Sequence, residues 1–483
     1  MREDWTECCF EDLLDYEQPT KYIVKSTKYN DSYKMPVLTA GKTFIKGYTN
    51  ETDGIFDNLP TIIFDDFTTA TQYVNFKFKV KSSAMKILVP TSKLVNMPLV
   101  YYAMQVNQVR SDTHKRYWIS VFAKKKFLLP PFVEQKAIVK RIEELFSSLD
   151  SGIEDLKKAK DQLFIYRQAV LKKAFEGEFT KEWRKKQTNL PSADELISQI
   201  KEERKKHYEQ QLSVWKETVR VWKNNGEKGK KPKKPTILKP NLDLSKLVQE
   251  LNVLPQYWTY INLDYAVYKL GDGLHGTPKY SETGEYYFIN GNNLDNGRIN
   301  IKSNTKKVER SEFLKYQKDL NKDTVFVSIN GTIGNVSFYN DEKVILGKSA
   351  CYFNLLSGFN KNYIRWRIDS LGFRNYAFRN ATGSTIKNVP LSAMRNYTFP
   401  LCSIEEQAQI VQEIESRLSV CYKIEESINE SLQKTIALRH SILKKAFDGK
   451  LLSAEEIARC KKDKDFEPAT LLLQKIKTEK NQK

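Results

Sequence analysis

The sequence repeats itself after 272 positions, and this internal repeat constrains the fold more than any other feature. Residues 134–139 read EQKAIV and residues 406–411 read EQAQIV, while LKKAF occurs at both 171–175 and 443–447. The register between these matches holds without a gap. One structural unit is therefore expected twice in the chain.

Each copy carries residues at alternating steps of four and three, the spacing typical of a helix in a coiled coil. The predicted seam of the first helix consists of Ile138, Ile142, Leu145, Leu149, Leu156 and Leu163, with Gly152 as an interruption. The predicted seam of the second helix consists of Ile410, Ile414, Ile424, Ile428, Leu438 and Ile442, with Arg417, Ser431 and Thr435 as polar breaks. Because both seams are imperfect, we expect the helices to pair antiparallel, each about 38 residues or roughly 57 Å long.

Local signals mark where the two helices begin and end. Pro130 and Pro131 precede the first helix, and residues 403–406 (SIEE) form a capping box at the start of the second. Gly177 and Gly449 stand where C-terminal glycine stops are expected.

A globular segment precedes each helix, at residues 1–131 and 255–401, and each opens with a Trp-Thr step, at Trp5 and Trp258. Aromatic and β-branched residues between glycine and asparagine turns predict short strands in both. The interiors of the two segments differ, whereas the helices are alike. We therefore expect an α/β (α+β) fold in which one helical scaffold carries two different recognition domains.

The remaining segments are a connection and a tail. The predicted order is a first domain at 1–131, a central helix at 132–178, a helical and basic linker at 179–254, a second domain at 255–401, a C-terminal helix at 402–450 and a tail helix at 451–483. Residues 201–240 hold 13 Lys+Arg and 5 Asp+Glu. This stretch is interpreted as a solvated flexible connection, with a nonspecific phosphate-binding arm as the alternative. Residues 196–203 also resemble residues 472–479.

The charge balance indicates a polyanionic partner. Lys+Arg number 79 against 59 Asp+Glu, which gives a net charge of +20, and nucleic acid is the first candidate. Hydrophobic residues make up 40% of the chain, so folded cores are expected. No run of 18 apolar residues occurs, and the first residues lack the apolar stretch of a signal peptide, which favours a cytoplasmic location.

Residue types suited to catalysis or metal binding are few and poorly spaced. The chain has four histidines and six scattered cysteines, so no catalytic, cofactor-binding or metal-binding residue is predicted. Residues 271–276 match GxGxxG, but Thr277 and Pro278 follow where a dinucleotide-binding fold needs a helix. Residues 41–43 (GKT) resemble the end of a phosphate-binding loop, whose first glycine is replaced by Pro36. We therefore expect a chain without catalytic activity.

Candidate DNA contacts are basic and amide side chains near turns, because arginine reads guanine edges, asparagine reads adenine edges and lysine binds phosphates. In the first domain they are Lys42, His114, Lys115, Arg116 and Tyr117. In the second domain they are Lys279, Asn290, Asn292, Asn293, Asn330, Lys348 and Lys387. The alternative interpretation is that these are ordinary turn and strand-end residues.

The ordered set of motifs resembles the specificity subunit of Type I restriction-modification systems. The resemblance rests on the helix entries at residues 130–135 (PPFVEQ) and 400–407 (PLCSIEEQ) and on LKKAFxG at both helix ends. Residues 276–278 (GTP) and 383–385 (GST) in the second globular segment also look like that family. Together these motifs cover essentially the whole chain.

The resemblance implies a double-stranded DNA-binding subunit in which each domain recognises half of a bipartite target and the helices fix the spacing. It also implies two methylation subunits and two restriction subunits as partners, with S-adenosylmethionine, ATP and magnesium in those partners rather than in this chain. The alternative is a coiled-coil scaffold that binds nucleic acid without sequence preference, and a stand-alone restriction-methylation enzyme is disfavoured by the missing catalytic motifs.

Overall fold

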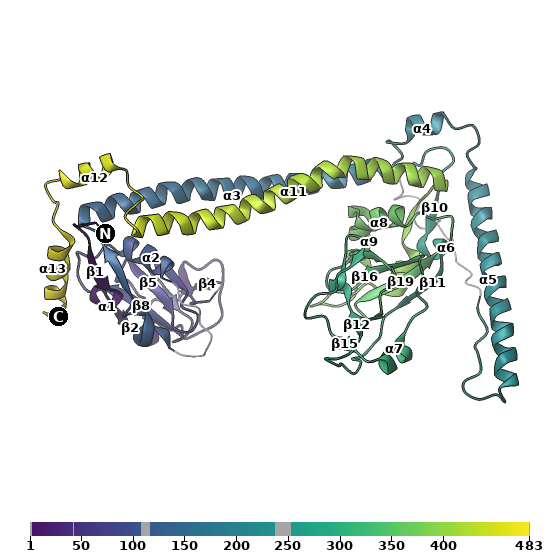
Figure 1. Cartoon of the computed structure of the whole chain (residues 1–483), viewed down its shortest axis with the longest axis horizontal. Helices are drawn as coiled ribbons and strands as arrows, with labels where there is room; N and C mark the ends of the chain where they lie inside the picture. The colour runs from purple at the N-terminus through teal and green to yellow at the C-terminus, as the bar shows by residue number, and fades with distance from the viewer. Residues whose placement is uncertain (1, 42, 108–115, 237–252, 483) are drawn as a thin grey trace. The chain divides into compact units, whose positions relative to one another are not determined.

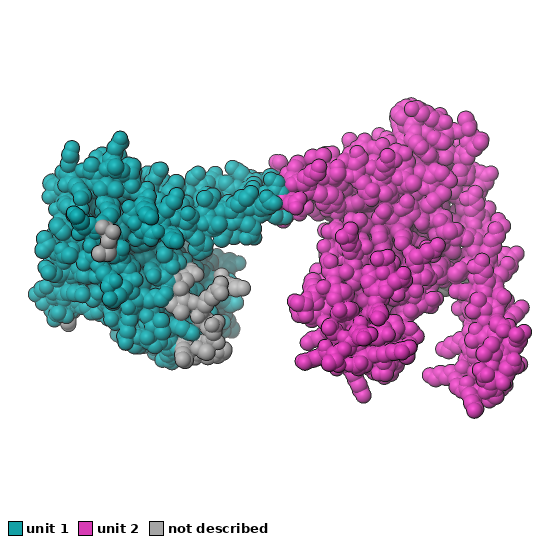
Figure 2. Space-filling model, viewed as in Figure 1, with its two compact units in different colours: residues 1–159, 427–483 teal, residues 160–426 magenta. Residues whose placement is uncertain are grey.

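The computed structural model describes residues 2–41, 43–107, 116–236 and 253–482, which form two compact units. Unit 1 consists of residues 1–159 and 427–483, and unit 2 of residues 160–426 (Figure 2). Two long helices, α3 (Phe132–Phe175) and α11 (Ile404–Phe447), each begin in one unit and end in the other. Each unit therefore contains one globular domain and a part of each long helix.

The domain of unit 1 is closed by its first and last strands, since β1 (Thr6–Cys9) pairs antiparallel with β9 (Lys126–Leu129). Between them lies an antiparallel sheet in the order β2 (Leu14–Glu17), β8 (Met85–Pro90), β5 (Thr61–Asp65) and β6 (Thr71–Val74). A second sheet has the order β4 (Ile45–Thr49), β3 (Met35–Leu38) and β7 (Lys79–Val80). Helix α2 (Met97–Val106) packs its buried leucine, valine and methionine side chains into the core that contains Phe64 and Leu88.

The domain of unit 2, drawn in green in Figure 1, is closed in the same way. Its strand β10 (Thr259–Asn262) pairs antiparallel with β20 (Thr398–Leu401). Its larger sheet has the order β11 (Val267–Asp272), β19 (Ala350–Leu355), β16 (Thr324–Ser328) and β17 (Val336–Phe338). Its smaller sheet has the order β15 (Lys307–Val308), β12 (Tyr286–Ile289) and β18 (Val344–Leu346). The helices of this domain are α6 (Leu263–Ala266), α7 (Arg310–Tyr316), α8 (Lys361–Asp369), α9 (Leu371–Asn380) and α10 (Leu391–Asn396).

The two long helices run antiparallel in each unit. In unit 2, Lys160 pairs with Glu425 at 3.9 Å, and the guanidinium of Arg167 lies 5.3 Å from the ring of Tyr422. In unit 1, Arg439 pairs with Asp150. Residue numbers on one helix rise as those on the other fall, so the prediction of mixed domains joined by a pair of long helices is confirmed.

The predicted seams need two corrections of register. In α3, Gly152 is exposed and the half-buried Ile153 takes the seam position, so the glycine does not interrupt the packing. In α11, Ile424 and Leu438 are 42% and 51% exposed, and the sequence assigned them wrongly to the seam.

A regular heptad explains the second correction. From Ile414 the inward-facing residues of α11 follow steps of four and three: Ile414, Leu418, Cys421, Glu425, Ile428, Leu432, Thr435, Arg439 and Ile442. From Ile414 the predicted seam takes a step of three first and the structure a step of four, so Glu425 and Arg439 hold the inward positions in place of Ile424 and Leu438 and pair across to α3. The other predicted seam residues are buried or half-buried: Ile138, Ile142, Leu145, Leu149, Leu156, Leu163, Ile410, Ile414, Ile428 and Ile442.

After each long helix the chain turns back and covers the domain of the unit in which that helix ends. In unit 1, α12 (Ala454–Lys461) leads to α13 (Ala469–Asn481), whose Leu472 and Ile476 join the core around Phe10. In unit 2, α4 (Lys181–Lys185) leads to α5 (Ala193–Asn224), whose Leu196 and Ile200 join the core around Tyr265.

The expected flexible connection at residues 201–240 is therefore wrong for residues 201–224, because these residues belong to α5, which docks on the second domain through Leu196 and Ile200. Among the described residues, no helix combines the length and the apolar character needed to cross a bilayer.

Candidate nucleic-acid interface

The repeated Glu-Gln step has a structural role at the start of α11. The carboxylate of Glu406 is 1% exposed and accepts hydrogen bonds from Trp258 Nε1 at 2.8 Å, Thr180 Oγ1 at 2.8 Å and Arg184 Nε at 2.9 Å. The guanidinium of Arg184 also lies 5.4 Å from the centre of the Trp258 ring. We name Thr180, Arg184, Trp258 and Glu406 the carboxylate cluster, which joins the start of the second domain to α11 and to the segment that follows α3.

The same arrangement occurs in unit 1 with an arginine from a different place in the chain. Glu134 accepts a hydrogen bond from Trp5 Nε1 at 2.9 Å and forms an ion pair with Arg2. Gly449 has a φ of +72°, and a Cβ there would lie 2.9 Å from Cδ of Arg2. The repeated tryptophan, glutamate and glycine therefore fasten each domain to its helices, and they are packing residues rather than DNA contacts.

A set of turns converges at one edge of the second domain. We name residues 272–276, 290–293, 329–334, 347–349 and 382–388 the loop cluster. Its turns are joined by backbone hydrogen bonds, from Lys348 to Leu274 at 3.1 Å and from Gly331 to Lys387 at 3.4 Å. The hydroxyl of Ser349 also donates to Asn290 Oδ1 at 3.0 Å. Segments separated by more than a hundred residues thus form one continuous surface.

The loop cluster contains most of the contact residues predicted in this domain. The side chains of Asn292, Lys348 and Lys387 are exposed. Asn290 and Asn330 are half-buried and make hydrogen bonds within the cluster. The surface therefore offers two lysines and an exposed amide beside turns, a combination that suits phosphates and base edges.

Two predicted residues of the second domain are not exposed on this surface, one because it is buried within the loop cluster and one because it lies elsewhere in the domain. Asn293 is buried and its side chain donates to the carbonyl of Asn300 at 2.9 Å, so its amide is used inside the domain. Lys279 is exposed but lies beside α7, where its backbone amide donates to Glu312 at 3.0 Å.

In the first domain the predicted contacts are only partly described. Lys42, His114 and Lys115 lie outside the described residues. Arg116 is exposed, whereas Tyr117 is buried in the core, so its ring is unavailable to DNA in this structure. Two lysines of this domain that were not singled out from the sequence are buried, Lys79 and Lys86. The ammonium of Lys79 donates to the carbonyls of Asp53 and Gly54 and fixes a turn.

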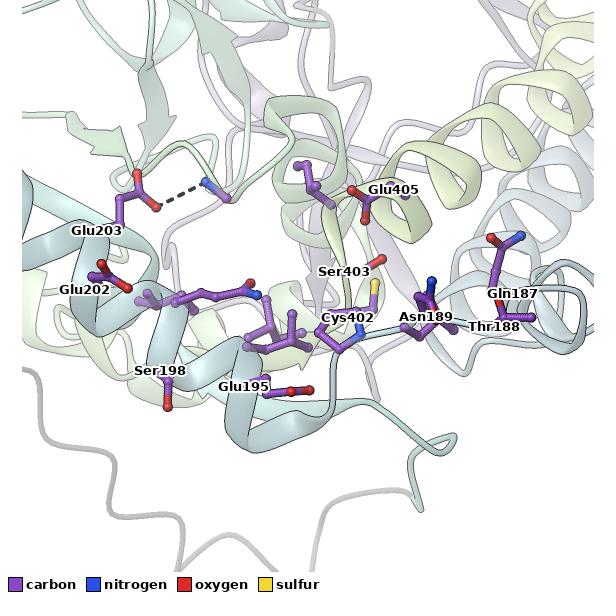
Figure 3. Close-up of a pocket in the computed structure, with 18 of the residues that line it drawn as sticks. Gln187, Thr188, Asn189, Glu195, Ser198, Glu202, Glu203, Cys402, Ser403 and Glu405 are labelled. Atoms are coloured by element: carbon purple, nitrogen blue, oxygen red, sulfur yellow. Dashed lines mark hydrogen bonds between the residues drawn. The ribbon is translucent and has the colours of Figure 1, made fainter.

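The cavity between α5 and the start of α11 does not suit a nucleotide or an anion. It has a volume of about 870 Å³ (Figure 3). Four carboxylate residues line it: Glu195, Glu202, Glu203 and Glu405. A phosphate group would be repelled there.

The described residues give no sign of a metal centre or a reactive thiol. They contain no group of three or more potential metal ligands. Burial raises the pKa of the Cys351 thiol to about 12 and that of Cys402 well above its ordinary value, so neither is a thiolate at neutral pH. These two cysteines are core residues.

Two mixed domains, each closed by its first and last strands and each fastened to a pair of long helices, define a protein with two structurally related modules. The family model of the "Type I restriction modification DNA specificity domain" matches residues 2–159 and 264–434. The chain belongs to this family of DNA-recognition components.

Individual relatives agree with this assignment over parts of their length. The chain is 45% identical over 174 residues to the specificity subunit of the Type I restriction enzyme EcoR124I/EcoR124II of Escherichia coli, covering 33% of this chain and 43% of that protein. It is 23% identical over 359 residues to the EcoBI specificity subunit of Escherichia coli, covering 73% of this chain and 64% of that protein. These alignments thus span less than two thirds of either relative.

One solved structure supports the fold. A chain in the structure described as "Structural basis underlying complex assembly and conformational transition of the type I R-M system" superposes with a TM-score of 0.56 at 13% identity. The match covers 93% of this chain and 99% of that one. At this identity the likeness concerns the fold alone.

Proposed function

We propose that this chain is the DNA-recognition subunit of a Type I restriction-modification complex and recognises a bipartite double-stranded DNA target, half with each domain. The observation that carries the proposal is the family match to both domains, residues 2–159 and 264–434. The different interiors of the domains favour two different half-sites. The rival scaffold without sequence preference receives no support from the comparisons.

The chemistry would belong to partner subunits. We propose that two methylation subunits and two restriction subunits assemble with the chain and that adenine methylation or restriction follows its choice of site. S-adenosylmethionine, ATP and magnesium would be bound by those subunits. The chain itself contributes the DNA contacts, for which Arg116 and the loop cluster are the candidates.

The loop cluster provides the test. Replacing Lys348 and Lys387 together by alanine should weaken binding of a target-containing duplex at least about tenfold, because two phosphate or base-edge contacts are lost. The assay is a titration of the assembled methylation complex with labelled duplex at two salt concentrations.

A matched double substitution is available in the same domain. Lys315, in α7, and Lys343, directly before β18, are both exposed. Lys348 follows the other end of β18. The variant Lys315→Ala/Lys343→Ala removes the same charge and should bind like the unaltered chain. Equal weakening by both pairs would contradict a local interface, and no weakening by either would remove the loop cluster from it.

A further inference from the structure

The first half of α5 is fixed to the second domain. Arg204 is buried and donates to the carbonyl oxygens of Val267 at 2.9 Å, Asp264 at 2.8 Å and Tyr265 at 2.7 Å. The imidazole of His207 lies 3.8 Å from the centre of the Tyr268 ring. This half of the helix is therefore held in place by polar as well as apolar contacts.

The second half of α5 packs against the segment that follows it. We name residues 209–236 the basic arm. The indole of Trp215 donates to the carbonyl of Pro232 at 3.0 Å, and that of Trp222 donates to the carbonyl of Gly229 at 3.4 Å. In Figures 1 and 2 this part of unit 2 stands away from the domain. The returning segment, residues 225–236, is thus fastened to the helix by two hydrogen bonds from tryptophan side chains to backbone carbonyls.

The basic arm carries a strong and uncompensated positive charge. It contains eight basic and three acidic residues, a net charge of +5. The returning segment contributes five exposed lysines: Lys228, Lys230, Lys231, Lys233 and Lys234. In the part of the chain that the structure describes, none of these five takes part in an ion pair within 4.0 Å. By contrast, Arg220 on the helix pairs with Glu217 at 3.2 Å.

The type and spacing of these charges suit a nucleic-acid backbone. Lysine is a flexible point charge that binds phosphates without reading bases, and prolines at 232 and 235 stiffen the segment between the charges. Repulsion among five free ammonium groups within seven residues is relieved when they lie along a polyanion.

We propose that the basic arm binds the phosphate backbone of double-stranded DNA outside the bases that the two domains recognise. This inference rests on the proposed function, from which it takes double-stranded DNA as the ligand. It assigns sequence-independent affinity to the arm, while the choice of sequence stays with the domains.

The test compares the unaltered chain with a variant in which all five lysines are replaced by glutamine. Both are assembled with the methylation subunits and titrated with a target duplex and a scrambled duplex over a range of salt concentrations. The glutamine variant should bind both duplexes at least about tenfold more weakly, and its salt slope should fall by about 2 to 4, because each phosphate contact contributes roughly 0.9. The target-to-scrambled ratio should not change.

A charge-conserving control separates phosphate binding from a structural effect. Replacing the same five lysines by arginine should restore the affinity and the salt slope. Unchanged affinity and slope in the glutamine variant overturn the proposal. The proposal is also overturned if the glutamine variant assembles more weakly with the methylation subunits while the assembled complex binds DNA normally. The arm would then bind an acidic protein surface. Equal binding of both duplexes by the unaltered chain overturns the proposed function instead, and the change in salt slope still decides the role of the arm.

Discussion

Replacing Ile414 by aspartate should destabilise unit 2 by at least about 4 kcal/mol. Ile414 is fully buried where α11 packs against the second domain and the end of α3. The substitution removes an apolar side chain from the core and puts an unpaired carboxylate in its place. The free energy of unfolding is measured by chemical denaturation of the full chain followed by tryptophan fluorescence.

The matched control is Ile424→Asp, on the same helix and with the same chemical change. Because Ile424 is 42% exposed and Glu425 holds the inward position, this variant should lose less than about 1 kcal/mol. Equal losses in the two variants would contradict the heptad register that places Glu425 inward. Little loss at Ile414 would contradict the packing of the helix against the domain.

Removing the carboxylate of Glu406 should cost about 3 to 5 kcal/mol. The change Glu406→Ala leaves the guanidinium of Arg184, the indole of Trp258 and the hydroxyl of Thr180 without their shared acceptor. Breaking a buried ion pair on one side is costly because the remaining charge stays desolvated. The unfolding free energy and the emission of Trp258 report the loss.

The neighbouring glutamate supplies the control for this variant. Glu405 lies in the same first turn of α11 but is exposed. Its contribution is limited to the favourable interaction of a negative charge with a helix N-terminus, so Glu405→Ala should cost at most about 1 kcal/mol. If the two variants were equally stable, the carboxylate cluster would not be what holds the domain to the helices.

The helices could be predicted from the sequence because their signals are local. The 272-residue repeat, the capping box at Ser403 and the heptad spacing indicate two similar helices. The register within the pair could not be predicted fully, since Glu425 and Arg439 occupy inward positions only because α3 offers partners there. Apolar periodicity in the sequence does not identify polar residues at inward-facing positions.

The candidate interface was only partly predictable. Turn chemistry indicated Asn290, Asn330, Lys348 and Lys387, but their convergence depends on strand pairings between distant segments. The burial of Asn293 depends equally on those pairings, because the carbonyl that it binds belongs to a later turn. Nothing in the local sequence says which side of a turn faces the core.

Exchanging one domain tests most directly whether the two domains read the two halves of one target. Residues 1–131 would be replaced by the corresponding domain of a relative, and methylated adenines would be mapped across the genome of cells that carry the methylation subunits and either chain. We predict one bipartite methylated motif that depends on the unaltered chain, and in the exchanged chain a motif with one half changed and the other half kept. A change in both halves, or a map that does not depend on this chain at all, would contradict the account.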